Sequence, residues 1–365
     1  MKKAALFPFN KTLLPIVRHF QELQMQYELT EVIALPGMGL AGKDVGVVCN
    51  QPSIGIQVVD ELDAESDKWD ILILVREYLP TGFDEQGMVK NLLSCMKELI
   101  ILEHSKDCIP QWLLKLDREE ELLKLVVPEA LWEKEVQTTG YEGIQTPVLL
   151  IGGVVEEADV LEVTVMTTKI LKDMGFVVAT VTKESAAGIF DFLDFKSLYS
   201  KCENEAEKII RLNHTLQLVE KEIVPDIIII EAPDALIRYN DLAPNGFGIQ
   251  TYMLCQAVQI DFMVCCMPYD LAQMDFLKLL NQDFSLRYGV EIDIVHASNV
   301  LVDSVDLINS KYLSVFNDVF DKMETFIMNT RTKTAIPVCN VISHTEQFGK
   351  YLQSLLESGE YIDEE

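Results

Sequence analysis

The fold class is decided by one short stretch, Pro225-Asp226-Ile227-Ile228-Ile229-Ile230-Glu231-Ala232-Pro233-Asp234. Four successive isoleucines give a β-branched apolar run without alternation, which is typical of a strand buried on both faces of a parallel sheet. Carboxylates follow at the carboxyl end of this strand, where open α/β sheets bind ligands. Glu231 and Asp234 are therefore candidates for a metal ligand and a general base. The alternative is a core strand that simply ends in solvated carboxylates.

Strand-like and helix-like segments alternate on both sides of a polar, glycine-containing segment, residues 137–147. A chain of 365 residues also exceeds the usual size of a single core. We therefore predict an α/β protein with two doubly wound, mostly parallel-sheet domains: a Rossmann-like domain over residues 1–140 and a P-loop NTPase-like domain over residues 147–365. Within the first domain, we expect one long helix over residues 87–103 and a strand within residues 107–116.

Composition excludes several classes of partner. The net charge is -28, so phosphate backbones and anionic membranes would be repelled. No apolar run reaches membrane-spanning length, and the start of the chain is too short in apolar residues for a signal peptide. The eight cysteines are scattered without a CxxC pair, which favours a reducing cytoplasm and argues against a disulfide framework or a zinc site. The vicinal pair Cys265-Cys266 leaves redox chemistry as a minor alternative.

A glycine-rich loop in the first half fits the spacing of a phosphate-binding P-loop almost completely. Gly37 is followed after four residues by Gly42-Lys43, but Asp44 replaces the Ser or Thr that should hold magnesium. The residues after it are β-branched and broken by Pro52, so the helix that should cradle phosphate is not expected. The loop is better explained as a turn that presents its polar groups to a ligand or to a domain contact; its candidate ligand-binding residues are Gly39, Gly42, Lys43 and Asp44.

The second half has a strand followed by Gly152-Gly153, as a P-loop domain would, but no lysine follows. The next residues, 154–159, carry three carboxylates, which would repel a triphosphate unless a metal intervened. Hydrolysis of a nucleotide by the usual route is therefore not expected, and the Walker A motif is predicted to be non-functional. Caps and turns also explain the other ligand-binding candidates expected at this sheet edge. These candidates are Gly152, Gly153, Lys183, Asn240, Gly246 and Gly248.

Several short motifs occur in the order found in a known family. They are Leu6-Phe7-Pro8-Phe9, Gly39-Leu40-x-Gly42-Lys43-Asp44, the isoleucine strand, Phe247-Gly248-Ile249 with Gln256-Ala257-Val258, and Arg287-Tyr288-Gly289-Val290-Glu291 with Ser298-Asn299-Val300. Over nearly its whole length the chain resembles the peptide maturation system proteins, which are encoded beside radical enzymes and precursor peptides in ribosomal natural-product clusters. No catalytic residues are carried over from that family. The second domain separately resembles the P-loop proteins that include ParA-like ATPases and dethiobiotin synthetase, and it departs from them at the key loop.

Three functions fit these observations. The first is an accessory protein that binds a precursor peptide or a maturation enzyme without hydrolysing a nucleotide, which is the function that the family resemblance implies. The second is an enzyme that uses a nucleotide or phosphorylated ligand at the sheet edge; Lys43 and Lys183 would then be its cations. The third is a small-metabolite sensor with its ligand between the domains. No cofactor is predicted for the first function, and a nucleotide with magnesium is the alternative.

Overall fold

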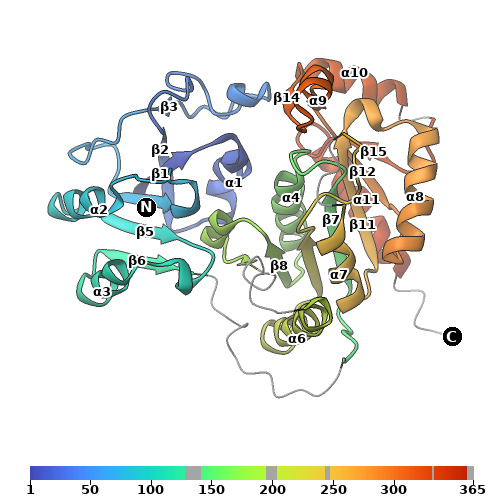
Figure 1. The fold of residues 1–365 in the computed structure, drawn as a ribbon, viewed down its shortest axis with the longest axis horizontal. Coiled ribbons are helices and arrows are strands. Elements are labelled where there is room, and N and C mark those ends of the chain that lie inside the picture. Colours follow the sequence, from blue (N-terminus) through green and yellow to red (C-terminus); the bar gives the residue numbers. More distant parts are fainter. Residues whose placement is uncertain (128–140, 195–203, 243–246, 331–332, 360–365) are drawn as a thin grey trace. The chain divides into compact units, whose positions relative to one another are not determined.

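A computed structural model describes residues 1–127, 141–194, 204–242, 247–330 and 333–359. The chain divides into two compact units (Figure 1). The first unit contains residues 1–129 and 184–197, and the second contains residues 130–183 and 198–365. Segment 184–197 therefore belongs to the first unit, although it lies within the second half of the sequence.

The first unit is built on a six-stranded sheet, counted over the described residues, with the order β3-β2-β1-β4-β5-β6. All of its strand pairings are parallel. This is the strand order of the doubly wound dinucleotide-binding folds, in which the order reverses between β1 and β4. The strands are β1 (Lys2–Phe9), β2 (Tyr27–Ala34), β3 (Val58–Val59), β4 (Ile71–Val75), β5 (Glu98–Leu102) and β6 (Leu123–Val126).

Helices cover this sheet, and their starts follow ordinary capping rules. Asp84, for example, accepts a hydrogen bond from the Gly87 amide at 2.9 Å and so caps α2. The core below them includes Trp69, which is fully buried and donates from its indole nitrogen to Glu31. The helices are η1 (Lys11–Leu13), α1 (Leu14–Leu23), η2 (Val47–Cys49), η3 (Arg76–Tyr78), α2 (Glu85–Ser94), η4 (Lys106–Cys108), α3 (Gln111–Glu119) and η6 (Ser185–Phe190).

Two of the secondary-structure predictions for the first unit are wrong. The helix expected over residues 87–103 ends at Ser94, and strand β5 follows it. Met96 separates the two with a positive φ of 58°, which a continuing helix cannot contain. The strand expected within residues 107–116 is instead occupied by η4 and α3. Short apolar runs suit a buried strand and a buried helix equally well, which explains both errors.

The second sheet has seven strands among the described residues, in the order β15-β12-β11-β7-β10-β8-β9. Its pairings from β15 to β8 are parallel. The isoleucine strand, β10, lies between β7 and β8 and is buried throughout, as the sequence predicted. The strands are β7 (Val148–Gly153), β8 (Val178–Thr182), β10 (Ile227–Glu231), β11 (Phe262–Pro268), β12 (Ile294–Ser298) and β15 (Val338–Cys339). The last strand in this order, β9 (Leu193–Asp194), comes from segment 184–197.

Helices cover this sheet as well, and one cluster of buried residues joins α4 and α11 to the sheet strands. Val163, Val264 and Phe348 belong to this cluster and are fully buried. A separate two-stranded antiparallel ribbon follows β12, made of β13 (Val300–Val302) and β14 (Val315–Asn317). The helices are α4 (Val160–Asp173), α6 (Glu205–Ile223), α7 (Ile249–Ala257), η7 (Tyr269–Leu271), α8 (Met274–Tyr288), α9 (Ser304–Ser310), α10 (Phe320–Thr330) and α11 (Thr345–Gly359).

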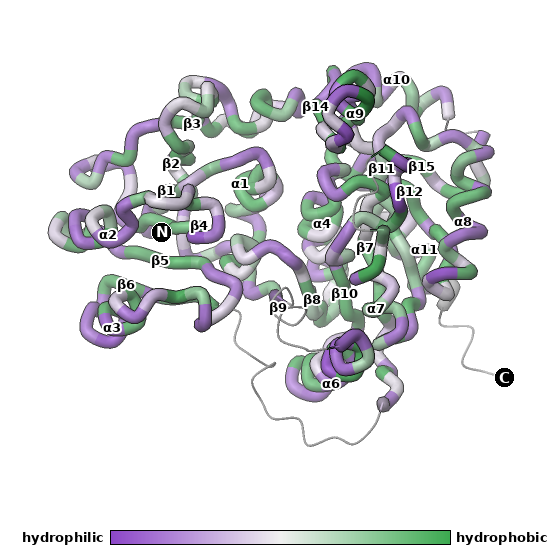
Figure 2. The backbone as a smooth tube through the Cα atoms, in the orientation of Figure 1, coloured by the Kyte–Doolittle hydropathy of each residue, from purple (hydrophilic) through white to green (hydrophobic). Residues whose placement is uncertain are grey.

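The architecture confirms the predicted α/β class with two mostly parallel sheets. Figure 2 shows hydrophobic residues concentrated along inner strands such as β5, β7 and β10, and polar residues in many of the loops and outer helix faces. In the described part of the chain, no helix combines the length and the apolar character needed to cross a membrane.

Candidate functional site

The carboxyl edge of the second sheet brings together several of the predicted residues. Strand β10 pairs with β7 on one side and with β8 on the other, and all three run in parallel. Glu231, Gly153 and Lys183 therefore lie at or just beyond the ends of three neighbouring strands. This is the edge where open α/β sheets bind ligands. We call the residues 154–159 that leave β7 there the β7–α4 loop.

Glu231 is buried at this edge and is bound by its own neighbours. It is 1% exposed. The Thr182 hydroxyl donates to its carboxylate, and the Lys183 amide donates to the same oxygen at 3.4 Å. A buried carboxylate needs such donors, because an unpaired charge inside the protein is costly. Glu231 thus holds the ends of β8 and β10 together, whatever further role it has.

The β7–α4 loop packs tightly against the rest of the unit. Positions 152 and 153 have no room for a side chain. A Cβ on Gly152 would lie 2.7 Å from Leu236, and a Cβ on Gly153 would lie 2.3 Å from the Val155 carbonyl oxygen. Val154 and Val155 are fully buried within the loop. The glycines therefore serve close packing of the chain, and buried apolar side chains occupy the loop interior.

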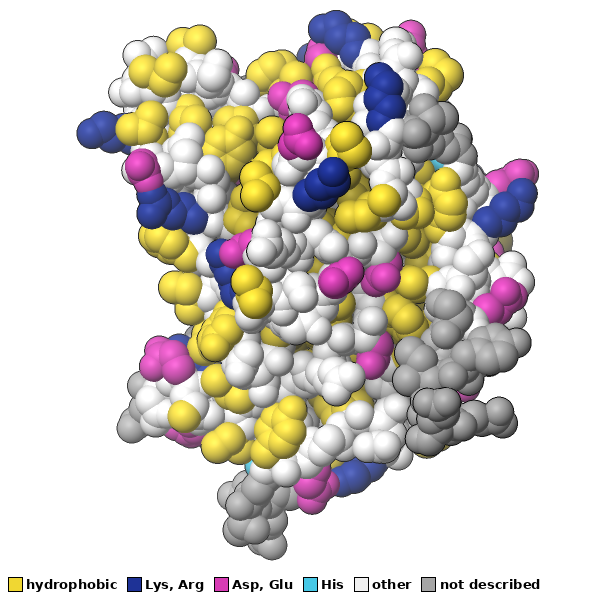
Figure 3. Space-filling view, turned by 90° about the vertical axis from the view of Figure 1, so that its right-hand side faces the viewer, with side chains coloured by type: hydrophobic (Ala, Val, Ile, Leu, Met, Phe, Trp, Pro, Cys, Tyr) yellow, Lys and Arg dark blue, Asp and Glu magenta, His cyan; other side chains and the backbone are white. Residues whose placement is uncertain are grey.

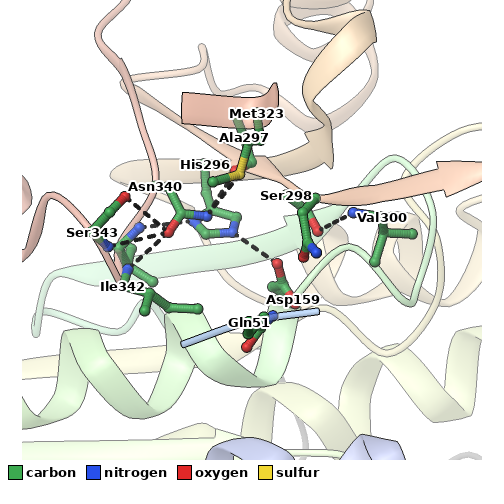
Figure 4. Close-up of polar contacts among 12 residues, drawn as sticks. Gln51, Asp159, His296, Ala297, Ser298, Val300, Met323, Asn340, Ile342 and Ser343 are labelled. Carbon is green, nitrogen blue, oxygen red and sulfur yellow. Dashed lines mark hydrogen bonds and ion pairs between the residues drawn. The ribbon is translucent and has the colours of Figure 1, made fainter. Parts of the chain in front are cut away.

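One residue of this loop forms a polar pair with the neighbouring part of the sheet (Figure 4). Counting from Gly153, the spacing of a P-loop places Asp159 at the position of the phosphate-binding lysine. A carboxylate oxygen of Asp159 lies 3.3 Å from Nε2 of His296. The Val341 amide donates to Nδ1 of the same ring at 3.2 Å, so the neutral ring carries its proton on Nε2 and donates it to Asp159. His296 is fully buried, on β12.

The charge around the loop is mostly negative. Lys183 lies close by and forms an ion pair with Glu156 at 2.9 Å. Burial, and then the neighbouring Glu156, raise the pKa of Glu157. A triphosphate placed here would meet the carboxylates of the loop, and Lys183 already pairs with one of them. The electrostatics of this edge suit a cationic group better than a phosphate.

The remaining candidates of the second unit stabilise its local structure. Asp234 accepts hydrogen bonds from the amides of Gln250 and Thr251 and from the Thr251 hydroxyl, at 3.1, 3.0 and 2.7 Å, and so holds the first turn of α7. Asn240 accepts from the Leu242 amide at 2.8 Å in a turn. Gly248 has a positive φ of 69°, and a Cβ there would lie 2.2 Å from the Tyr288 hydroxyl. Gly246 lies outside the described residues.

In the first unit, the glycine-rich loop is fastened by Asp44. Gly39 and Gly42 have positive φ values of 68° and 76° and form its turns. The carboxylate of Asp44 accepts hydrogen bonds from four backbone amides, those of residues 46, 47, 54 and 55, and from the Ser53 hydroxyl. Burial opposes ionisation, but these donors outweigh it and lower the pKa of Asp44. Lys43 is exposed beside this carboxylate, and only the short helix η2 follows, so the loop lacks the helix of a P-loop.

The first unit also contains a largely buried charged cluster that the sequence did not predict. His104 follows β5 and lies between the carboxylates of Asp194 and Glu77. Ser185 donates to the other oxygen of Glu77 at 2.5 Å, and Tyr78 donates to Glu184 at 2.7 Å. The helix expected over residues 87–103 would place His104 after a helix, whereas it follows the end of strand β5. The run Leu99–Leu102, recognised as a strand, would have placed His104 at a sheet edge.

The charge of this cluster follows from its contacts. Burial lowers the pKa of His104, but hydrogen bonds to Asp194 and Glu77 outweigh burial and raise its pKa to about 9. The ring is therefore cationic at neutral pH and compensates the two carboxylates beside it. We interpret the cluster as the fastening that holds segment 184–197 in the first unit, at the sheet edge where related folds bind a ligand.

Two further observations concern the chemistry available. Burial raises the pKa of both Cys265 and Cys266, which keeps these thiols protonated and unreactive.

Within the described ranges, no three His, Cys, Asp or Glu side chains are grouped to hold a metal ion. A cavity of about 580 Å³ lies in the first unit, with both apolar and charged residues around it, among them Ile100, Leu125 and Lys124.

The two sheets and their order place this chain among known structures. It shares its fold with a DUF1611 family protein. The crystal structure of that protein, from Anabaena variabilis, matches with a TM-score of 0.59 and 13% sequence identity, over 98% of this chain and 100% of that one. At this identity the likeness establishes the fold alone. No protein-family model matches the sequence, and no curated protein matches it.

Proposed function

We infer that the protein is a non-hydrolysing accessory protein of a peptide maturation system, which binds a precursor peptide or a maturation enzyme. The observation that carries this proposal is the Asp159–His296 pair in the β7–α4 loop. A loop that has no lysine, buries its valines and places a carboxylate at the lysine position is poorly suited to hold a triphosphate. The family resemblance of the sequence motifs supports the peptide maturation context.

The negative charge of the chain supports a basic peptide as the partner. The chain carries a net charge of -28, and the carboxyl edge of the second sheet adds carboxylates to a loop that has no cation of its own. An acidic surface attracts a basic peptide and accelerates its encounter with the protein. A precursor peptide with a basic segment is therefore the expected partner.

A thermal-shift screen with ATP and GTP, with and without magnesium, tests the absence of nucleotide binding. A ligand present at a hundred times its dissociation constant stabilises the native state by about 2.7 kcal/mol, which a melting curve resolves. We expect no shift, and we expect a precursor peptide to be retained in a pull-down by the full-length protein. A magnesium-dependent shift that Glu231→Gln abolishes, with the fold intact, would refute the proposal.

Two alternatives each have an observation in their favour. An enzyme that uses a nucleotide or phosphorylated ligand is favoured by Glu231, which ends a buried strand next to β7 as a magnesium-binding carboxylate would. A small-metabolite sensor is favoured by the cavity in the first unit, whose volume of about 580 Å³ is within the range of ligand pockets. The nucleotide screen separates the first alternative from the proposal, and a screen of metabolites addresses the second.

A further inference from the structure

The second unit carries an insertion that the sheet does not need. After β12 the chain forms β13, α9 and β14 before it returns to the sheet through α10 and β15 (Figure 1). We call residues 300–319 the 300–319 excursion. Among the strands that the structure describes, its two strands pair with each other, as an antiparallel ribbon. It is an addition to the α/β layers and is therefore available for a separate role.

Hydrogen bonds hold the excursion in a defined shape. Asp303 caps α9 by accepting from the amides of Val305 and Asp306 at 2.9 and 3.0 Å. The Ser314 hydroxyl donates to Asp306 at 2.9 Å. At its base, Asp318 accepts from the hydroxyl of Tyr269 at 2.8 Å. These hydrogen bonds hold the excursion at its helix cap, between α9 and β14, and at its base.

This element nevertheless exposes large apolar side chains to solvent. Five of them lie within fifteen residues and are between 47% and 71% exposed: Val305, Ile308, Tyr312, Phe316 and Val319. Val305 and Ile308 share one face of α9, since residues three apart on a helix are neighbours. Leu307 alone turns inward from that helix. Grouped exposed apolar residues on a soluble protein mark an interaction site.

The charges around these residues define the partner. Residues 300–330 contain five carboxylates and two lysines, and one of the lysines, Lys322, is paired with Asp318 at 2.8 Å. A second copy of this chain would bring the same acidic rim against this one, and a nucleic acid would add phosphates. A basic segment with apolar side chains satisfies both the charge and the apolar surface.

We propose that the 300–319 excursion is the docking surface for a lysine- or arginine-bearing amphipathic peptide segment. This rests on the proposed function and names the surface and the partner chemistry for it. The apolar side chains of the peptide cover Ile308, Tyr312 and Phe316, and its cations face the carboxylates around them. Desolvated apolar anchors supply affinity in such interfaces, while charges at the rim select the partner.

Another exposed apolar surface provides a control. Helix α8 exposes Leu279 and Leu286, the latter at 83%. Figure 3 shows the side of the molecule on which α8 lies, where hydrophobic side chains are scattered among both acidic and basic ones. There the neighbouring charges are mixed, with Lys278 beside the Arg287–Asp283 ion pair. This surface has no charge preference that would select a basic peptide. Leu286→Asp is therefore a matched change on the same unit, away from the excursion.

The experiment measures fluorescence anisotropy of a labelled peptide of leucine and lysine, with its leucines at helical spacing, against the full-length protein at physiological ionic strength. A twin peptide with glutamate in place of lysine is the charge control. We expect the lysine peptide to bind and its twin not to bind. Ile308→Asp should weaken binding at least tenfold, although the added carboxylate would strengthen a purely electrostatic attraction. Leu286→Asp should leave binding within twofold of the unmodified protein.

Each other outcome overturns the inference. Equal binding by Ile308→Asp and Leu286→Asp would place the peptide elsewhere and refute this surface, while peptide binding by the protein would stand. Absence of binding by the unmodified protein would refute the surface, and the nucleotide screen and pull-down would still judge the proposed function separately. If Ile308→Asp fails to fold, Val305→Ser replaces it, and hydrogen-exchange protection of residues 300–319 by the lysine peptide is the second measurement.

Discussion

Asp159 and His296 form a hydrogen-bonded pair, with 3.3 Å between a carboxylate oxygen and Nε2. The two residues are 137 positions apart in sequence. Asp159 is the N-cap residue of α4, and His296 lies on β12. Because the Val341 amide donates to Nδ1 of His296, the hydrogen bond to Asp159 is made by Nε2. The pair therefore joins the β7–α4 loop to β12 and commits a residue that a nucleotide-binding loop would direct to phosphate.

Asp159→Lys should not create a nucleotide site. The new ammonium would face the Nε2–H of a fully buried histidine, and buried valines would still occupy the loop. We expect a loss of about 1–3 kcal/mol in the free energy of unfolding, since a buried donor loses its acceptor. Asp159→Asn keeps an acceptor oxygen and should cost less. Urea denaturation measures both variants, and a nucleotide-dependent thermal shift in Asp159→Lys would contradict the prediction.

The stability of the protein should depend on pH through His104. Its pKa is raised from 6.5 to about 9 in the folded protein, so the folded state holds the proton more tightly than the unfolded state. The resulting stabilisation, roughly 3 kcal/mol, is complete below pH 6.5, declines as the pH rises and is lost above about 9. The difference in unfolding free energy between the unmodified protein and His104→Gln should shrink accordingly. A difference that stays constant from pH 6 to pH 10 would exclude this role for His104.

The control for that titration is an exposed ion pair. Lys115 and Glu119 lie 3.9 Å apart, and both side chains are mostly exposed. Such pairs contribute about 0–1 kcal/mol. Lys115→Gln should therefore follow the curve of the unmodified protein at every pH, which separates the His104 effect from general charge repulsion in an acidic chain.

Asp44 and Lys43 should differ sharply when each is replaced by alanine. Asp44→Ala leaves several backbone amides of the glycine-rich loop without their acceptor, and we expect it to cost about 1–3 kcal/mol and to expose the loop to proteases. Lys43→Ala changes an exposed side chain and should stay within about 0.5 kcal/mol. Limited proteolysis and thermal melting report both. Equal behaviour of the two variants would mean that Asp44 does not fasten the loop.

Alanine substitutions at Gly248 and Gly289 distinguish the cost of backbone strain from the cost of a steric clash. Both have positive φ values, 69° and 75°, but a Cβ on Gly289 meets no atom within 4 Å, whereas one on Gly248 would lie 2.2 Å from the Tyr288 hydroxyl. Gly289→Ala should cost about 1 kcal/mol from the left-handed conformation alone. Gly248→Ala should cost clearly more, because Tyr288 or the chain must move. Thermal melting of the two variants gives the comparison, and equal losses would show that the site can relax.

Periodicity and strand chemistry were enough to predict most of the α/β framework. The isoleucine run gave β10, and the alternation of elements around it gave two mostly parallel sheets. The failures lie where an apolar run is too short to distinguish helix from strand, as in Leu99–Leu102. The sequence did show that the β7–α4 loop lacks a lysine, because that depends on residue types and spacing alone.

The partners of the candidate residues could not be predicted, because they depend on long-range contacts. Nothing local in the sequence links Asp159 to His296 or His104 to Asp194. Asp44 was expected to face a ligand or a domain contact, and only the folded loop places five donors around it. A carboxylate in a glycine-rich loop can bind a ligand or fasten the loop, and the two uses have the same local sequence.

Segment 184–197 has a consequence for the synthesis of the protein. The first unit needs this segment, and the ribosome releases it only after the residues of β7, α4 and β8 have been made. Domains usually fold from the amino terminus as each is completed. Until then Glu77 and His104 of the first unit lack their partners Ser185 and Asp194, while the second unit has already begun, so the two units are completed in overlapping steps. A gene fusion or truncation between residues 129 and 184 would therefore separate the first unit from a part of itself.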